Sequence, residues 1–249
     1  MRFSRKILIL LILIITACSQ PLEYVQPPTP QTIRIAFLSV VSPLADLIQF
    51  CISERPEDYF VVHEIPLLPL DNQTDLVFWL GEKPASFSFA APIGWESISV
   101  VLNQNNPLNH LRIKDVRALF SGNVTNWKQL EGEERPVSVW VYPEEDEIQH
   151  QFASFLEANR PFTSLAFLAT NPAIVIEAVS SDPGAIGFIP TAWVDASVKP
   201  VRLEVESPSL PVLVLSTTVP KGAARDFIAC LQSQPGQTVL KSRYLPWDH

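Results

Sequence analysis

Residues 101–130 constrain the fold more than any other stretch of this 249-residue chain. The apolar run Ile98–Leu102 is typical of a strand, and Pro107 in the polar turn after it stops the strand from continuing. Apolar residues then recur near helical spacing, which predicts a helix over 113–120. Gly122 suits the left-handed end of that helix. The stretch therefore predicts a strand, a turn and a helix in immediate succession.

Strand-like and helix-like stretches alternate through the rest of the chain, which predicts an α/β fold with mainly parallel sheets. One of the strands, Asp75–Leu80, is short and almost uniformly apolar, as expected when both faces of a sheet are covered. The predicted strands are Thr32–Leu38, Tyr59–Ile65, Asp75–Leu80, Val137–Tyr142 and Ala185–Ile189, and the predicted helices are Pro43–Ser53, 113–120, 144–158, 172–180, 222–233 and 236–242.

The N-terminus has the pattern of an export signal. A basic start precedes the apolar run Ile7–Ile15, which is too short to cross a bilayer core of about 30 Å. Small residues before Cys18 resemble a bacterial lipobox, whose cysteine becomes lipid-modified; a plain secretory signal with an incidental cysteine is the alternative. We therefore predict a signal peptide over 1–17, a lipid anchor at Cys18 and a proline-rich linker over 18–31. This places the protein outside the cytoplasm, in a bacterial cell envelope.

Two further cysteines, Cys51 and Cys230, lie on predicted helices. No cysteine or histidine spacing typical of a zinc site is present, and we expect neither a metal nor a cofactor. In an oxidising compartment the two cysteines could form a disulfide. Two separately buried thiols are the alternative.

Composition excludes several function classes. The net charge of −8 would be near −11 (−8 minus 3) without Arg2, Arg5 and Lys6. Such an acidic surface argues against nucleic-acid partners, although ordinary solubility explains it equally well. No catalytic motif is present, and the consecutive carboxylates of 144–147 do not face each other across a substrate. We therefore expect a protein that is not an enzyme.

The sequences of three segments resemble motifs of the phosphate-type periplasmic solute-binding proteins of ABC importers. These are NNP with LFSGNVTNW in 101–130, SSDPGAIGFIP before position 191, and the closing QPGQTVLKSRYLP. The resemblance implies a two-lobed periplasmic-binding-protein fold of type II with a ligand cleft between the lobes. It also implies an ABC transporter permease as partner, a first lobe over 32–101 and 191–249, and a second lobe over 102–190. The helices of Cys51 and Cys230 would then share a lobe.

The same resemblance places a ligand site, but with altered residues. Ser39 and Ser42 stand near the hydroxyls of the family's first turn, although Ser42 could instead be a helix N-cap. The positions of the family's serine and aspartate fall on Trp79 and Leu80, and the family's arginine and glycine-rich turn is replaced by an acidic segment. The candidate ligand-binding residues are Ser39, Ser42, Trp79, Tyr142, Glu145 and Asp146.

Two interpretations of the acidic segment 142–147 remain open. It could be an ordinary helix start, with Pro143 at the first position and the acids stabilised by the helix dipole. It could also adapt the cleft to a cationic or neutral hydroxylated ligand, with Tyr142 and Trp79 as stacking surfaces. Either interpretation argues against phosphate. The expected function is ligand capture for an ABC importer; the alternative is a sensory or interaction module without small-anion binding.

Overall fold

A computed structural model of the protein describes residues 29–65, 74–157 and 162–247. Residues 31–249 form one compact unit. The predicted signal peptide, Cys18 and most of the linker lie outside the described residues. Within the described ranges, no helix is long and apolar enough to cross a membrane.

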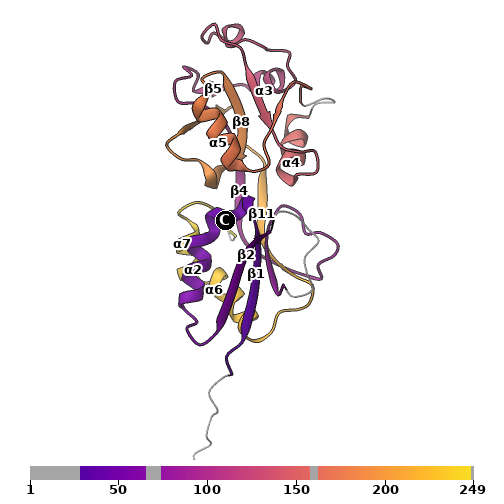
Figure 1. Ribbon diagram of the computed structural model, residues 1–249, viewed down its shortest axis with the longest axis vertical. Coiled ribbons are helices and arrows are strands. Elements are labelled where there is room, and N and C mark those ends of the chain that lie inside the picture. Colours follow the sequence, from indigo (N-terminus) through magenta and orange to yellow (C-terminus); the bar gives the residue numbers. More distant parts are fainter. Residues whose placement is uncertain (1–28, 66–73, 158–161, 248–249) are drawn as a thin grey trace, which may run out of the picture. The chain divides into compact units, whose positions relative to one another are not determined.

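One group of strands contains both ends of the described chain. Strand β1 (Thr32–Leu38) pairs in parallel with β2 (Tyr59–Ile65) on one side and with β3 (Leu76–Leu80) on the other. Strand β11 (Ser209–Ser216) then lies antiparallel between β3 and the first half of β4 (Phe89–Asn103). The parallel strands β1 and β3 are largely apolar, so helices can cover them. Figure 1 shows helices α2, α6 and α7 beside this group.

The second half of β4 belongs to another group of strands. There it pairs antiparallel with β8 (Ala185–Pro190), which pairs in parallel with β6 (Ser138–Val141). Every residue of β8 is buried. Helices α3 (Ile113–Phe120), α4 (Glu147–Leu156) and α5 (Pro172–Ser181) accompany this group, and β4 runs from one group to the other (Figure 1). The predicted α/β class is confirmed, but the pairing is mixed rather than mainly parallel, because the strands around β4 and β11 are antiparallel.

Shorter elements complete the fold. They are the 3-10 helices η2 (Ser39–Leu44), η3 (Trp127–Leu130) and η4 (Thr191–Trp193), and the strands β5 (His110–Leu111), β7 (Phe167–Leu168), β9 (Val198–Pro200), β10 (Arg202–Leu203) and β12 (Leu245–Pro246).

Two buried polar side chains of the stretch 101–130 hold parts of the second strand group together. Buried Asn103 donates from Nδ2 to the carbonyl oxygens of Val179 and Ser180, both at 2.8 Å, and so fixes the end of α5 against β4. Buried Trp127 donates from Nε1 to the carbonyl of Gly184 at 2.9 Å. These polar groups find partners inside the protein, which is the condition for burying them. The most family-like residues of the chain are therefore structural.

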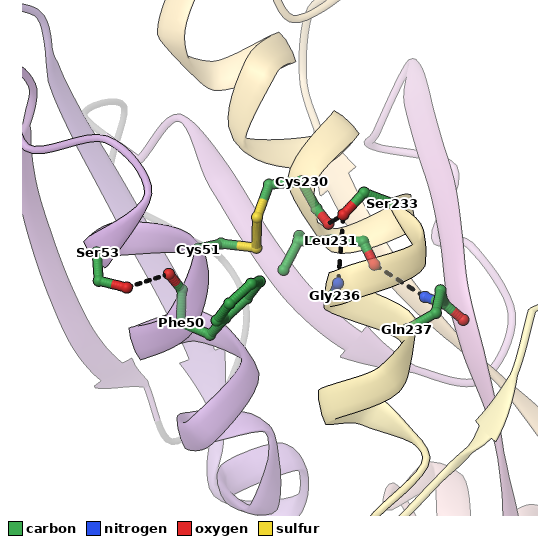
Figure 2. The surroundings of a disulfide bond; sticks show 8 residues. All are labelled: Phe50, Cys51, Ser53, Cys230, Leu231, Ser233, Gly236 and Gln237. Atoms are coloured by element: carbon green, nitrogen blue, oxygen red, sulfur yellow. Dashed lines mark hydrogen bonds between the residues drawn. A yellow bond between two sulfur atoms is a disulfide. The ribbon is translucent and has the colours of Figure 1, made fainter.

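Cys51 and Cys230 form a disulfide, with Cα atoms 5.8 Å apart and a sequence separation of 179. Figure 2 shows this bond joining α2 (Ala45–Ser53) to α6 (Gly222–Gln232), with α7 (Gln234–Leu240) following α6. The alternative of two separate thiols is wrong. The bond ties the N-terminal part of the first strand group to its C-terminal part.

Three predicted helix starts are wrong, and a proline lies near each of them. The helix expected over 236–242 is α7, which begins at Gln234 and has Pro235 in its first turn. Pro43 lies inside η2, and the α-helix begins only at Ala45, with Leu44 rather than Ser42 at its N-cap. Pro143 is not at the first position of a helix: α4 begins at Glu147, and Asp146 is its N-cap. By contrast, β1, β2 and α3 have the predicted bounds.

Candidate ligand-binding site

A cavity of about 130 Å³ lies where strands of both groups end. It collects the carboxyl ends of β1, β3 and β6 together with the starts of α4 and α5, and ligands of open α/β sheets bind at such strand ends. Its lining residues are Leu38, Ser39, Val40, Trp79, Leu80, Tyr142, Glu145, Asp146, Glu147, Ile148, Thr170, Asn171 and Pro172. Five of the six candidate residues are therefore brought together, and Ser42 is the exception.

Two aromatic side chains form part of the wall. Trp79 is partly buried and donates from Nε1 to the carbonyl of Glu82 at 2.8 Å, which fixes its indole. Tyr142 is 1% exposed, and its hydroxyl has no hydrogen-bond partner among the described residues. Burial, and secondarily the charge of Asp146, raises the pKa of Tyr142 well above its usual value. A buried hydroxyl without a partner costs free energy, so a ligand that bonded to it would gain affinity.

The acidic segment forms another side of the cavity. Asp146 accepts a hydrogen bond from the amide of Ile148 at 2.9 Å and so caps α4. Burial raises the pKa of Asp146, although bonds from the amides of Ile148 and Gln149 oppose that rise. Glu145 is exposed at the edge of the cavity. The segment therefore starts a helix, with Asp146 rather than Pro143 at its beginning, and it also lines the cavity.

The two candidate serines are in different positions. Ser39 lines the cavity, and its hydroxyl donates to the carboxylate of Glu64. The hydroxyl of Ser42 donates to the carbonyl of Ser39 at 2.6 Å, and Ser42 lines a separate surface hollow. Of the two serines, only Ser39 therefore lines the cavity.

Sequence reasoning missed Thr170, Asn171 and Pro172. A local signal exists, because Asn171 followed by Pro172 is a helix start, and Asn171 accepts from the amide of Ile174 at 3.2 Å. Nothing in the sequence says that this helix start faces the acidic one. That juxtaposition comes from the pairing of β6 with both β7 and β8.

A second buried acid lies where β4 changes partners. Glu96 is the residue opposite Leu210 of β11, and two residues later Ile98 pairs with Pro190 of β8. Its carboxylate accepts from the amides of Ser97 at 2.8 Å and Ala192 at 3.3 Å. Burial raises the pKa of Glu96 to about 8. Strand β4 links the two groups, and Glu96 connects it to η4, the 3-10 helix that follows β8.

The described carboxylates of the cavity lining do not form a metal site. Within the ranges that the structure describes, no group of three or more His, Cys, Asp or Glu side chains is placed to hold a metal ion.

The strand groups, joined through β4 in one sheet, and the helices beside them define a mixed α/β fold with a cavity at the strand ends. The chain belongs to the PBP superfamily: residues 82–239, more than half of the chain, match its domain.

Several solved structures are similar to this protein. A putative phosphate ABC transporter substrate-binding protein from Clostridium perfringens, solved with bound phosphate, is 18% identical with a TM-score of 0.77, and the match covers 86% of this chain and 98% of that one. An ABC-type phosphate transport receptor from Vibrio cholerae is 21% identical, with a TM-score of 0.64 and coverage of 86% and 99%. An OxyR2 regulatory-domain variant from Vibrio vulnificus is 12% identical, with a TM-score of 0.60 and coverage of 85% and 96%. At these identities the likeness shows the fold alone.

Proposed function

We propose that this protein is an extracytoplasmic solute-binding protein that captures a small ligand in the 130 Å³ cavity and delivers it to an ABC permease. The observation that carries the proposal is the cavity itself, which gathers the ends of β1, β3 and β6 and is lined in part by Tyr142, a buried residue whose hydroxyl has no partner among the described residues. Ser39, Trp79, Glu145 and Asp146 would contact the ligand with it. Lipid on Cys18 would hold the protein at the membrane.

The proposal includes two lobes that close on the ligand by a hinge motion. The first would span 32–101 and 191–249 and the second 102–190. The change of partners within β4, between Ser97 and Ile98, supports a crossing near the first of these boundaries. On the return path, η4 lies against the same part of β4, through the bond from Ala192 to Glu96.

A thermal-shift screen tests ligand capture. The mature protein is heated with phosphate, sulfate, sugars, amino acids, choline and polyamines, and a bound ligand raises Tm by an amount that grows with the logarithm of its concentration over Kd. Thr170→Trp narrows the mouth of the cavity at an exposed position, while Thr238→Trp adds the same bulk at an exposed position on α7. Stabilisation that is lost in Thr170→Trp and kept in Thr238→Trp supports capture. No stabilisation by any compound would contradict it.

The alternative function is a sensory or interaction module that keeps the fold without transport. The partial filling of the cavity by Trp79 and Leu80 favours it, because bulky side chains stand where the phosphate-type family has polar donors. Deletion of a permease gene that neighbours this gene on the chromosome separates the two functions. If the protein serves transport, the deletion should abolish uptake of its ligand; if it is a sensory or interaction module, uptake should not change.

A further inference from the structure

We propose that the cavity binds a small organic cation carrying an ammonium group, rather than an oxyanion. This inference rests on the proposed function and names the class of ligand for the same site. Three features of the cavity support it: hydrogen-bond donors that are already bonded within the protein, charged lining residues that are all acidic, and an aromatic wall.

The helix that would hold an anion is already capped by the protein. A helix N-terminus binds anions through its free amides and its dipole. At the start of α4 the carboxylate of Asp146 takes this place, accepting from the amide of Ile148 at 2.9 Å. A second anion would meet the charge of Asp146 instead of a free donor.

Two further donors near the cavity are also used, and a third position has none. At the start of α5, Pro172 has no N–H and the amide of Ile174 is bonded to Asn171. The hydrogen of the Ser39 hydroxyl is donated to Glu64. The oxygen of Ser39 keeps lone pairs, so it can accept a hydrogen bond from an ammonium group but does not offer one to an anion.

The charge of the lining has one sign. Glu145, Asp146 and Glu147 line the cavity, and its described lining contains no Lys or Arg. Carboxylates in a partly desolvated site favour a cation and repel an anion. The protein itself uses only part of the hydrogen-bonding capacity of these carboxylates. Glu147 accepts from Gln151 at 2.9 Å, and Asp146 accepts from the backbone.

The uncharged wall suits the same class of ligand. An ammonium group over the face of a tryptophan or tyrosine is attracted by the ring. Trp79, a partly buried residue of the lining, supplies such a ring. Tyr142 also lines the cavity but is only 1% exposed, so a ligand reaches its ring and its oxygen, which has no partner among the described residues, only when this side chain shifts. The volume of about 130 Å³ is below the range of roughly 300–1,000 Å³ of sites for drug-sized ligands, so the ligand is small.

Isothermal titration of the mature protein with matched probes tests the proposal. Choline, ethanolamine and putrescine are the cationic probes, and 3,3-dimethylbutan-1-ol is the uncharged isostere of choline. Glu145→Gln and Asp146→Asn remove one charge each, and asparagine keeps the helix cap. Glu144→Gln removes a charge from the neighbouring exposed residue, which does not line the cavity.

We expect at least one cationic probe to bind, and the uncharged isostere and phosphate not to bind. Glu145→Gln and Asp146→Asn should each weaken that binding about tenfold or more, while Glu144→Gln should change it less than about twofold. Binding of phosphate, sulfate or a sugar that Thr170→Trp abolishes would overturn the cationic class and leave ligand capture standing. Absence of binding by every compound, in titration and in the thermal-shift screen, would overturn both proposals.

Discussion

The side chain of Glu147 lies directly against the backbone of Gly81, so that a Cβ at position 81 would be 2.5 Å from the Cγ of Glu147. Gly81 follows β3 of the first strand group, and Glu147 begins α4 of the second. Gly81 also has a φ of +100°, which favours glycine. This contact joins the end of β3 to the start of α4, next to the cavity that Leu80 and Glu147 both line.

Gly81→Ala should therefore lower the free energy of unfolding by about 1–3 kcal/mol, through steric overlap and backbone strain. In a Glu147→Ala background the overlap is absent and only the strain remains, so the same substitution should cost less. Urea denaturation of the four proteins measures the difference. Equal costs in both backgrounds would show that the contact is not tight.

Glu96 should make stability fall with rising pH. Its pKa rises from 4.5 to about 8 on folding, so the folded protein holds this proton more tightly. The stabilisation is complete below pH 4.5 and is lost as pH rises towards 8, at up to about 1.4 kcal/mol per pH unit. Glu96→Gln should remove this slope, whereas exposed Glu82→Gln should keep it. Parallel stability curves for wild type and Glu96→Gln between pH 5 and 8 would contradict the prediction.

Asn103 should matter for stability and not for ligand binding. Asn103→Asp replaces the NH₂ group that bonds Val179 and Ser180 by an acceptor, which should cost about 2–4 kcal/mol. Asn105→Asp makes the same chemical change at an exposed turn position and should cost less than about 0.5 kcal/mol. Urea midpoints measure both. A comparable loss in the two variants would argue against the buried role of Asn103.

Removal of the disulfide with the double variant Cys51→Ala and Cys230→Ala should lower the free energy of unfolding by about 2–5 kcal/mol, because the bond closes a long loop. Dithiothreitol should bring the wild type close to the level of the variant and leave the variant unchanged. An effect of the reductant on the variant would point to another cause.

Cys18→Ser should move the protein from the membrane fraction to the soluble fraction of cells, because the predicted lipid is then absent. Ser19→Ala leaves the cysteine in place and should remain in the membrane fraction. Fractionation followed by immunoblotting measures the distribution. Retention of Cys18→Ser in the membrane would contradict a lipid anchor at this residue.

The sequence predicts elements well where the local pattern is regular. Strands β1 and β2 and helix α3 have the predicted bounds, because alternation or helical spacing is bounded by clear turns. The sequence does not predict the first half of β4, because Pro92 and Gly94 argue against a strand. The structure accommodates them on β4 with a register irregularity opposite Val212 and Leu213 of β11.

The site could be predicted only in part. Resemblance to a family indicated Tyr142, Asp146 and Trp79, and the structure brings them to one cavity. It could not show that Asp146 caps α4, because Pro143 is an equally good first helical residue by local rules. Nor could it reveal Glu96 as a buried acid, since burial depends on η4, nearly a hundred residues away in sequence.

The position of β11 between β3 and β4 sets an order of assembly during synthesis. Strands β3 and β4 are neighbours in sequence, but they do not pair with each other along the sheet, and the strand that joins them ends at Ser216. A chain released before that residue would present two unpaired apolar edges, which promote aggregation. The first strand group is therefore completed only late in translation, whereas β4 to β8, with the helices among them, can pair earlier. We expect chains shortened before 209 to be insoluble, even though they retain every residue that lines the cavity.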